Sequence, residues 1–144
     1  MIRARYVVGA ASIFLTFHLF CHFLNWYFLI WWTDIAAHFL AGATAALFWW
    51  WLLERENSAT GTISTTHFSW TNFVSIISFA TFVSALWEFW EFSNWRFAFL
   101  RETTGQLQIQ YQPILGNNLG DIVWGLCGGI VVATIYYCVM RKRD

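Results

Sequence analysis

Charged residues are scarce in this sequence. Only 11% of its 144 residues are charged, and its net charge is zero. A soluble domain carries about 25% charged residues, so this composition excludes a typical water-soluble domain. The chain also has no basic stripe of the kind that binds nucleic acid, which excludes a nucleic-acid partner.

Cysteine is scarce as well. Its three occurrences, Cys21, Cys127 and Cys138, all lie inside apolar runs. An odd number of cysteines in such runs does not indicate a disulfide framework. We interpret them as small apolar packing residues.

Long apolar segments are what the sequence has in abundance. Hydrophobic residues make up 58% of the chain and aromatic residues 22%. A helix needs about 20 apolar residues to cross a bilayer core about 30 Å thick. Four segments meet this length, and they predict an all-α membrane protein, a four-transmembrane-helix bundle in a single domain over residues 1–144, with spans at about 6–32, 35–53, 70–92 and 119–140.

The residues at the two ends of the first span bear on whether it is a signal peptide and on how it connects to the second span. Arg3 and Arg5 precede it as in a signal peptide, but an apolar run of about 7–15 residues is typical of such peptides. We therefore expect an uncleaved span. Only Thr33 and Asp34 separate it from the second span, which predicts a tight antiparallel hairpin.

Lysine and arginine predict the orientation of the bundle. Cytoplasmic loops are enriched in these residues. Only Arg96 and Arg101 lie on one side of the predicted membrane. The other six lie on the opposite side: Arg3, Arg5, Arg55, Arg141, Lys142 and Arg143. We predict a multi-pass protein of the cell inner (plasma) membrane with cytoplasmic N and C termini.

Small residues predict close helix packing. Gly125 and Gly129 form a GxxxG pair in the fourth span, and small residues let helix backbones approach closely in lipid. We interpret the pair as packing within one bundle. Homo-oligomerisation through the same helix face is the alternative.

Ionisable residues inside the spans are the main functional signal, because such groups are costly in lipid and normally face the bundle interior. Most occur in pairs three or four positions apart, which share one helical face: His18 and His22, Asp34 and His38, Glu88 and Glu91, with Asp121 alone. In the predicted topology they lie in the outer half of the bilayer, His18 nearest the middle. We therefore predict one site.

Each residue also has a purely structural interpretation. Asp34 and Asp121 fall in predicted first turns, where a carboxylate is stabilised by the helix dipole. The histidines could serve as hydrogen-bonding groups in the helix packing. Glu88 and Glu91 lie near a predicted helix C-terminus, where the dipole opposes negative charge. These two glutamates therefore require a cation, a proton or a histidine.

Carboxylates and imidazoles at helical spacing can hold Zn, Fe or Mn in a helix bundle. The predicted ligands of such a divalent transition metal are His22, Asp34, His38, Glu88, Glu91 and Asp121, with His18 as a further candidate. Asp34, His38, Glu88, Glu91 and Asp121 are also the candidate catalytic acids and bases. In a metal-free site some carboxylates would be protonated and others paired with histidine or with Arg96 and Arg101. A softer Cu or Zn site that includes Cys21 is a weaker option.

Three short motifs resemble a known family. Residues 33–42, TDIAAHFLAG, resemble the Asp-x-x-x-His-Phe motif of bacterial YjdF-like membrane proteins and of the VanZ-like family. Residues 84–91, SALWEFWE, are similar to the YjdF pattern of two glutamates three apart. Residues 117–129 resemble the last-helix pattern Asp-x-x-x-Asp followed by glycine seven residues later, with Asp121 and Gly128 in the second and third places.

The last motif departs from both families. Asn117 stands where the YjdF pattern has its first aspartate, and Gly125 replaces the asparagine expected in the VanZ-like register. These departures leave the ligand set open. The resemblance covers the last three spans and implies a small polytopic inner-membrane protein, without an activity to transfer.

Three functions follow as hypotheses, and whether the protein is an enzyme stays open. The first is a site that acts on a membrane lipid or a lipid-linked head group. The second is proton or divalent-cation transport, which is disfavoured because the inner half of the predicted bundle has no matching ionisable residues. The third is a non-enzymatic membrane subunit, in which buried charges only set helix register.

Overall fold

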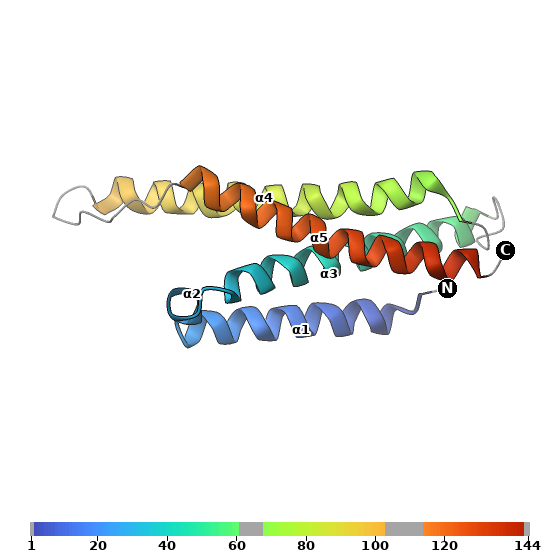
Figure 1. The fold of residues 1–144 in the computed structure, drawn as a ribbon, viewed down its shortest axis with the longest axis horizontal. Coiled ribbons are helices and arrows are strands. Elements are labelled where there is room, and N and C mark those ends of the chain that lie inside the picture. The colour runs from blue at the N-terminus through green and yellow to red at the C-terminus, as the bar shows by residue number, and fades with distance from the viewer. Residues whose placement is uncertain (1, 61–67, 103–113, 143–144) are drawn as a thin grey trace.

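A computed structural model describes residues 2–60, 68–102 and 114–142. Within these ranges the only regular elements are helices: α1 (Ala4–Phe23), α2 (Trp26–Leu29), α3 (Thr33–Thr60), α4 (Trp70–Glu102) and α5 (Ile114–Arg141). The four long helices run side by side in an elongated bundle (Figure 1). Each of the four is long and apolar enough to cross a membrane, which confirms the predicted all-α architecture.

Both chain ends lie at the same end of the bundle, which we call the terminal end (Figure 1). The opposite end, where α2 lies, is the distal end. Helix α3 is central and packs against α1, α4 and α5, while α4 also packs against α5. Helix α1 is peripheral, because in the described ranges its Cα atoms come within 8 Å of α2 and α3 only.

The first helix is shorter than predicted. It ends at Phe23, and the chain reverses through Asn25, which has a left-handed backbone with φ 56°. Asparagine is among the few residues that adopt this conformation readily. The Thr33 hydroxyl then donates to the carbonyls of Trp26 and Ile30 at 3.1 and 2.7 Å. The connection between α1 and α3 therefore covers residues 24–32, including α2, whereas the sequence predicted a tight turn at residues 33 and 34.

The other three helices are longer than predicted. Helix α3 continues to Thr60, α4 continues to Glu102, and α5 already begins at Ile114. The predicted boundaries followed hydropathy, which marks where the chain leaves the membrane. A helix does not end there, because its backbone hydrogen bonds are internal and continue into water.

These boundaries overturn two electrostatic arguments from the sequence. Asp121 lies seven residues into α5 and not in its first turn, so a dipole role for it is wrong. Glu88 and Glu91 lie 11 or more residues before the end of α4 at Glu102. The dipole acts only within the last turn, so it does not oppose their charge.

The apolar core fills the half of the bundle next to the terminal end. It joins α3, α4 and α5, and none of its buried members is Asp, Glu, His, Lys or Arg. These members are Ala46, Trp50, Ile76, Ala80, Val132, Ala133, Tyr136 and Met140. The Trp50 and Tyr136 rings meet edge to face, with centroids 5.3 Å apart. Just beyond this core, Glu54 is buried and accepts hydrogen bonds from the Trp50 indole and the Ile2 backbone N–H.

Glycines set the contact between α3 and α5. A side chain added at Gly42 would collide with the backbone carbonyl of Gly125, and one at Gly128 would collide with the carbonyl of Phe39. A side chain added at Gly129 would lie 2.7 Å from the Ala80 methyl group on α4. Gly125 and Gly129 are therefore packing residues inside the bundle, and homo-oligomerisation stays a prediction.

Candidate functional site

Three helices bring acidic and imidazole side chains together in the distal half of the bundle. Asp34 and His38 lie in the first two turns of α3, Glu88 and Glu91 lie on α4, and Asp121 lies on α5. His38, Glu88 and Asp121 are buried, with 5%, 5% and 6% of their surface exposed. The close packing of α3 on α5 carries Asp121 to the same depth as His38.

His38 is the centre of this cluster. Its Nε2 lies 3.4 Å from Asp34 Oδ1, and its Nδ1 lies 3.4 Å from Glu88 Oε1. A neutral imidazole donates from one nitrogen only, so it cannot donate to both carboxylates. A proton or a metal cation is therefore needed on one of the two sides of the ring.

Glu88 carries the least satisfied atom of the site. Its Oε1 is fully buried and has no hydrogen-bond partner in the described part of the chain. Both distances from the imidazole, at 3.4 Å, exceed the usual range of about 2.7–3.2 Å for an N–H···O hydrogen bond. An unpaired buried carboxylate is costly. A proton or a cation at the cluster would remove this cost.

The cluster contains two groups with metal-ligand geometry. Asp34, His38 and Asp121 form one, and His38, Glu88 and Glu91 form the other; in each, the ligand atoms lie within 4.8 Å of one another. Two ligands about 2.1 Å from one tetrahedral ion would stand about 3.4 Å apart. The separation of His38 Nε2 and Asp34 Oδ1 is 3.4 Å, and this donor set suits Zn, Fe or Mn.

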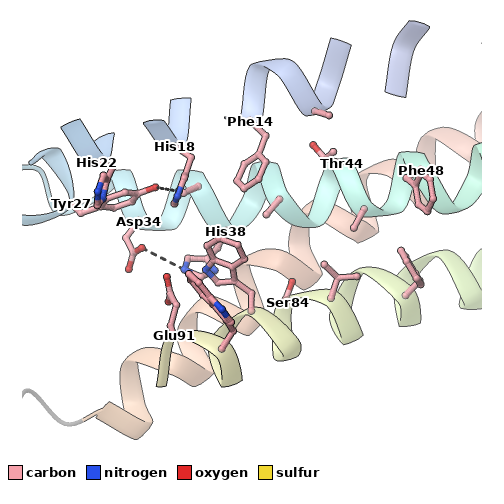
Figure 2. A pocket seen from close by; sticks show the side chains of 18 of the residues that line it. Phe14, His18, His22, Tyr27, Asp34, His38, Thr44, Phe48, Ser84 and Glu91 are labelled. Carbon is pink, nitrogen blue, oxygen red and sulfur yellow. Dashed lines mark hydrogen bonds and ion pairs between the residues drawn. The ribbon is translucent and has the colours of Figure 1, made fainter. Parts of the chain in front are cut away.

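A cavity of about 930 Å³ lies beside the cluster, between α1, α3 and α4. Asp34, His38 and Glu91 line its distal part, while Phe48 lines the opposite part (Figure 2). Between them the walls are mostly aliphatic and aromatic. Glu88 and Asp121 do not line the cavity. They lie beside His38, on the side that is away from the cavity.

The histidines of α1 line the same cavity but belong to neither ligand group. His18 Nδ1 forms a 2.7 Å hydrogen bond with the Tyr27 hydroxyl, and its ring meets Trp87 edge to face at 5.6 Å. His22 is exposed at the distal end of the cavity (Figure 2). Among the described residues, Cys21 is also outside both groups, although it is fully buried.

Sequence reasoning missed Tyr27. It treated residues 6–32 as one straight helix, in which positions 18 and 27 lie far apart. The reversal at Asn25 brings the two side chains into contact. An asparagine inside an otherwise apolar run was the available signal. The side chains of Arg96, Arg101 and Asn117, and all of Pro113, lie outside the described residues.

Sequence comparison places almost the whole chain in one family. A family model described as "Predicted membrane protein (DUF2238)" matches residues 5–142. The chain belongs to this family. YjdF-like proteins are known by the same family designation, so the predicted YjdF-like resemblance is confirmed at family level. Similarity to VanZ-like proteins stays a prediction.

No curated protein and no solved structure matches the chain. Membership of DUF2238 agrees with the four apolar helices, and the chain is a membrane protein. The matched region includes all five residues of the carboxylate and imidazole cluster.

Proposed function

We propose that this protein binds a membrane lipid or a lipid-linked molecule in its cavity and acts on the head group at the carboxylate and imidazole cluster. One observation carries the proposal: a single cavity has Asp34, His38 and Glu91 at one end and an apolar wall along the rest. A polar head and an apolar tail are the two parts of a lipid.

The size of the cavity supports a lipid-like ligand. Its volume of about 930 Å³ is near the upper limit of about 300–1,000 Å³ for small-molecule sites. It follows α3 from Asp34 to Phe48, a rise of about 21 Å at 1.5 Å per residue. This length is about two thirds of a 30 Å bilayer core.

Access from the bilayer is consistent with the packing of α1. The backbone of this helix approaches α3 but not α4. Between α1 and α4 the described ring contact joins His18 and Trp87. A lipid tail would enter between these two helices by displacing side chains, without separating packed backbones.

For the head-group site we propose a divalent transition metal held by Asp34, His38 and Asp121. Two carboxylates would balance the charge of one such ion. Metal-bound histidines usually donate their other N–H to a carboxylate, and His38 Nδ1 faces Glu88 Oε1 at 3.4 Å. Glu88 would then orient His38, and its orphan oxygen would accept the Nδ1 proton.

The chemistry that this arrangement supports is acid–base catalysis on a polar head group. A bound Zn, Fe or Mn ion would supply Lewis acidity toward a head-group oxygen. Glu91 lines the cavity and is exposed, so it can take or give a proton there. His22 lines the same end of the cavity and is the candidate assisting residue (Figure 2).

The packing favours this proposal over transport. An ion pathway needs polar groups through the whole depth of the bundle, but among the described residues the buried core between the cluster and Glu54 contains no Asp, Glu, His, Lys or Arg. A non-enzymatic subunit makes a different prediction: Glu88→Gln with Glu91→Gln would leave function intact and could raise stability. The orientation we propose places the cluster in the outer leaflet of the inner (plasma) membrane.

Native mass spectrometry of the detergent-purified protein tests the lipid site. We expect the wild type to retain a bound lipid, and variants that fill the cavity, Ala45→Phe and Thr44→Phe, to lose it. Val74→Phe places the same phenylalanine side chain on an outward-facing surface and should retain the lipid. Equal lipid retention by all four folded proteins would contradict the proposal.

A further inference from the structure

The polar end of the cavity has an excess of negative charge. Asp34 and Glu91 line it, and none of its lining residues is Lys or Arg. Figure 2 shows these two carboxylates pointing toward one another across the cavity. Behind them stand the buried side chains of Glu88 and Asp121.

A metal ion does not remove this excess. One divalent cation at Asp34, His38 and Asp121 would offset two negative charges, and Glu88 would accept the His38 Nδ1 proton. The charge of Glu91 would still be uncompensated. The two glutamates belong to one group with His38 whose ligand atoms lie within 4.8 Å of one another.

Aromatic rings surround the same end of the cavity. Tyr27, Trp87 and Trp90 all line it, and the Trp87 and Trp90 rings are 5.2 Å apart with a 41° tilt. Aromatic faces attract cations, and groups of aromatic rings bind quaternary and protonated amines. The cation–π contacts described in the chain lie elsewhere, at Tyr6, Trp51 and Tyr137.

We propose that the head group recognised here is cationic: a protonated or quaternary amine on an amphiphile, bound at Glu91 and bordered by Trp87 and Trp90. The apolar tail would lie along α3 toward Phe48. This inference rests on the proposed function, because it names the lipid class that the cavity takes. A head group that carries only phosphate would be repelled by the same charges.

Binding of matched amphiphiles to the full-length protein in maltoside detergent tests the inference. The probes share one dodecyl chain and differ in the head group: dodecylamine, dodecyltrimethylammonium, dodecyl phosphate and the neutral dodecanol. We expect the two amines to bind at least about tenfold more tightly than the phosphate, a ratio equivalent to about 1.4 kcal/mol. The comparison uses chelator-treated protein, because a bound Zn²⁺ ion would itself attract the phosphate.

Two variants test whether Glu91 causes the amine preference, and a probe without a tail tests whether the alkyl chain contributes to binding. Glu91→Gln should lower the ratio of amine to phosphate affinity, because it removes one of the two carboxylates that line the cavity. Glu56→Gln, an exposed position near the other end of α3, should leave the ratio unchanged. Ethylamine should bind at least about tenfold more weakly than dodecylamine, since it lacks the buried tail.

The outcomes separate the two proposals. Equal or tighter binding of dodecyl phosphate to the chelator-treated protein would overturn the cationic head group and leave the lipid site intact. An amine preference that Glu91→Gln does not alter would overturn it as well. Ethylamine binding as tightly as dodecylamine would assign the site to free amines. If no dodecyl probe bound, dodecanol included, the proposed function itself would be wrong.

Discussion

At the scale of single residues, His38 determines what the cluster can hold. Its two ring nitrogens face Asp34 and Glu88 at equal distances of 3.4 Å, so the residue links the cavity side of the cluster to its buried side. Replacing it would remove a proposed metal ligand and leave two carboxylates without their shared partner. Glu88, in contrast, would act on the metal only through His38.

This difference predicts a graded loss of metal. Elemental analysis of detergent-purified wild type should find a near-stoichiometric divalent transition metal. His38→Ala should lose it, and Glu88→Gln should bind it with about 10–100-fold lower affinity, the usual effect of losing such an orienting carboxylate. Glu56→Gln, away from the cluster, should keep the wild-type content. Absence of metal from the wild type, or the same content in all four proteins, would contradict the metal site.

The residue pairs of the cluster were predictable from sequence, but their relative burial was not. Spacing by three or four residues and a common depth were sufficient to group Asp34, His38, Glu88, Glu91 and Asp121. Which carboxylates face the cavity depends on how α3, α4 and α5 are rotated about their axes. That rotation depends on packing partners that are distant in the sequence. The sequence around Glu88 therefore could not predict that its Oε1 lacks a hydrogen-bond partner in the described part of the chain.

At the scale of elements, the contact between α3 and α5 positions the site. Gly42 and Gly125 allow the two backbones to meet, and Asp121 lies one turn before Gly125 on the same helix. A methyl group at Gly42 would meet backbone atoms, which cannot move aside as a flexible side chain can. The helices would have to separate, and the distance between Asp121 and His38 would increase.

We therefore expect Gly42→Ala to lower the free energy of unfolding by about 1–3 kcal/mol, the usual cost of overpacking. Gly120→Ala is the matched control, because a methyl group there has nothing within 4 Å; it should be neutral or stabilising by about 0.5–1 kcal/mol. Chemical denaturation in mixed micelles measures both. Equal effects of the two substitutions would show that the close approach of α3 and α5 does not limit stability.

Helix existence and order were predictable because apolar length alone identifies a membrane span. The residues at which the helices end were not predictable from hydropathy. Hydropathy gives no signal at Phe23, where α1 ends, since the residues that follow are equally apolar. It also gives a false signal at Ser93, beyond which α4 continues as a helix to Glu102.

At the scale of the whole molecule, the bundle has two unlike halves. A closed apolar core lies toward the terminal end, and the acidic cluster with its cavity lies toward the distal end. The two ends therefore make different contacts with the membrane surfaces. If the cavity binds a lipid as proposed, the surface that faces the cytoplasm decides which leaflet supplies it.

The distribution of Lys and Arg predicts that the terminal end is cytoplasmic. Single cysteines introduced into a variant without Cys21, Cys127 and Cys138 test this in intact cells. Asn25→Cys, exposed at the distal end, should react with a membrane-impermeant maleimide added outside. Ser58→Cys, exposed near the terminal end, should react only after the cells are opened. The reverse pattern would place the cluster in the inner leaflet, and its lipid would then have to come from the cytoplasmic side.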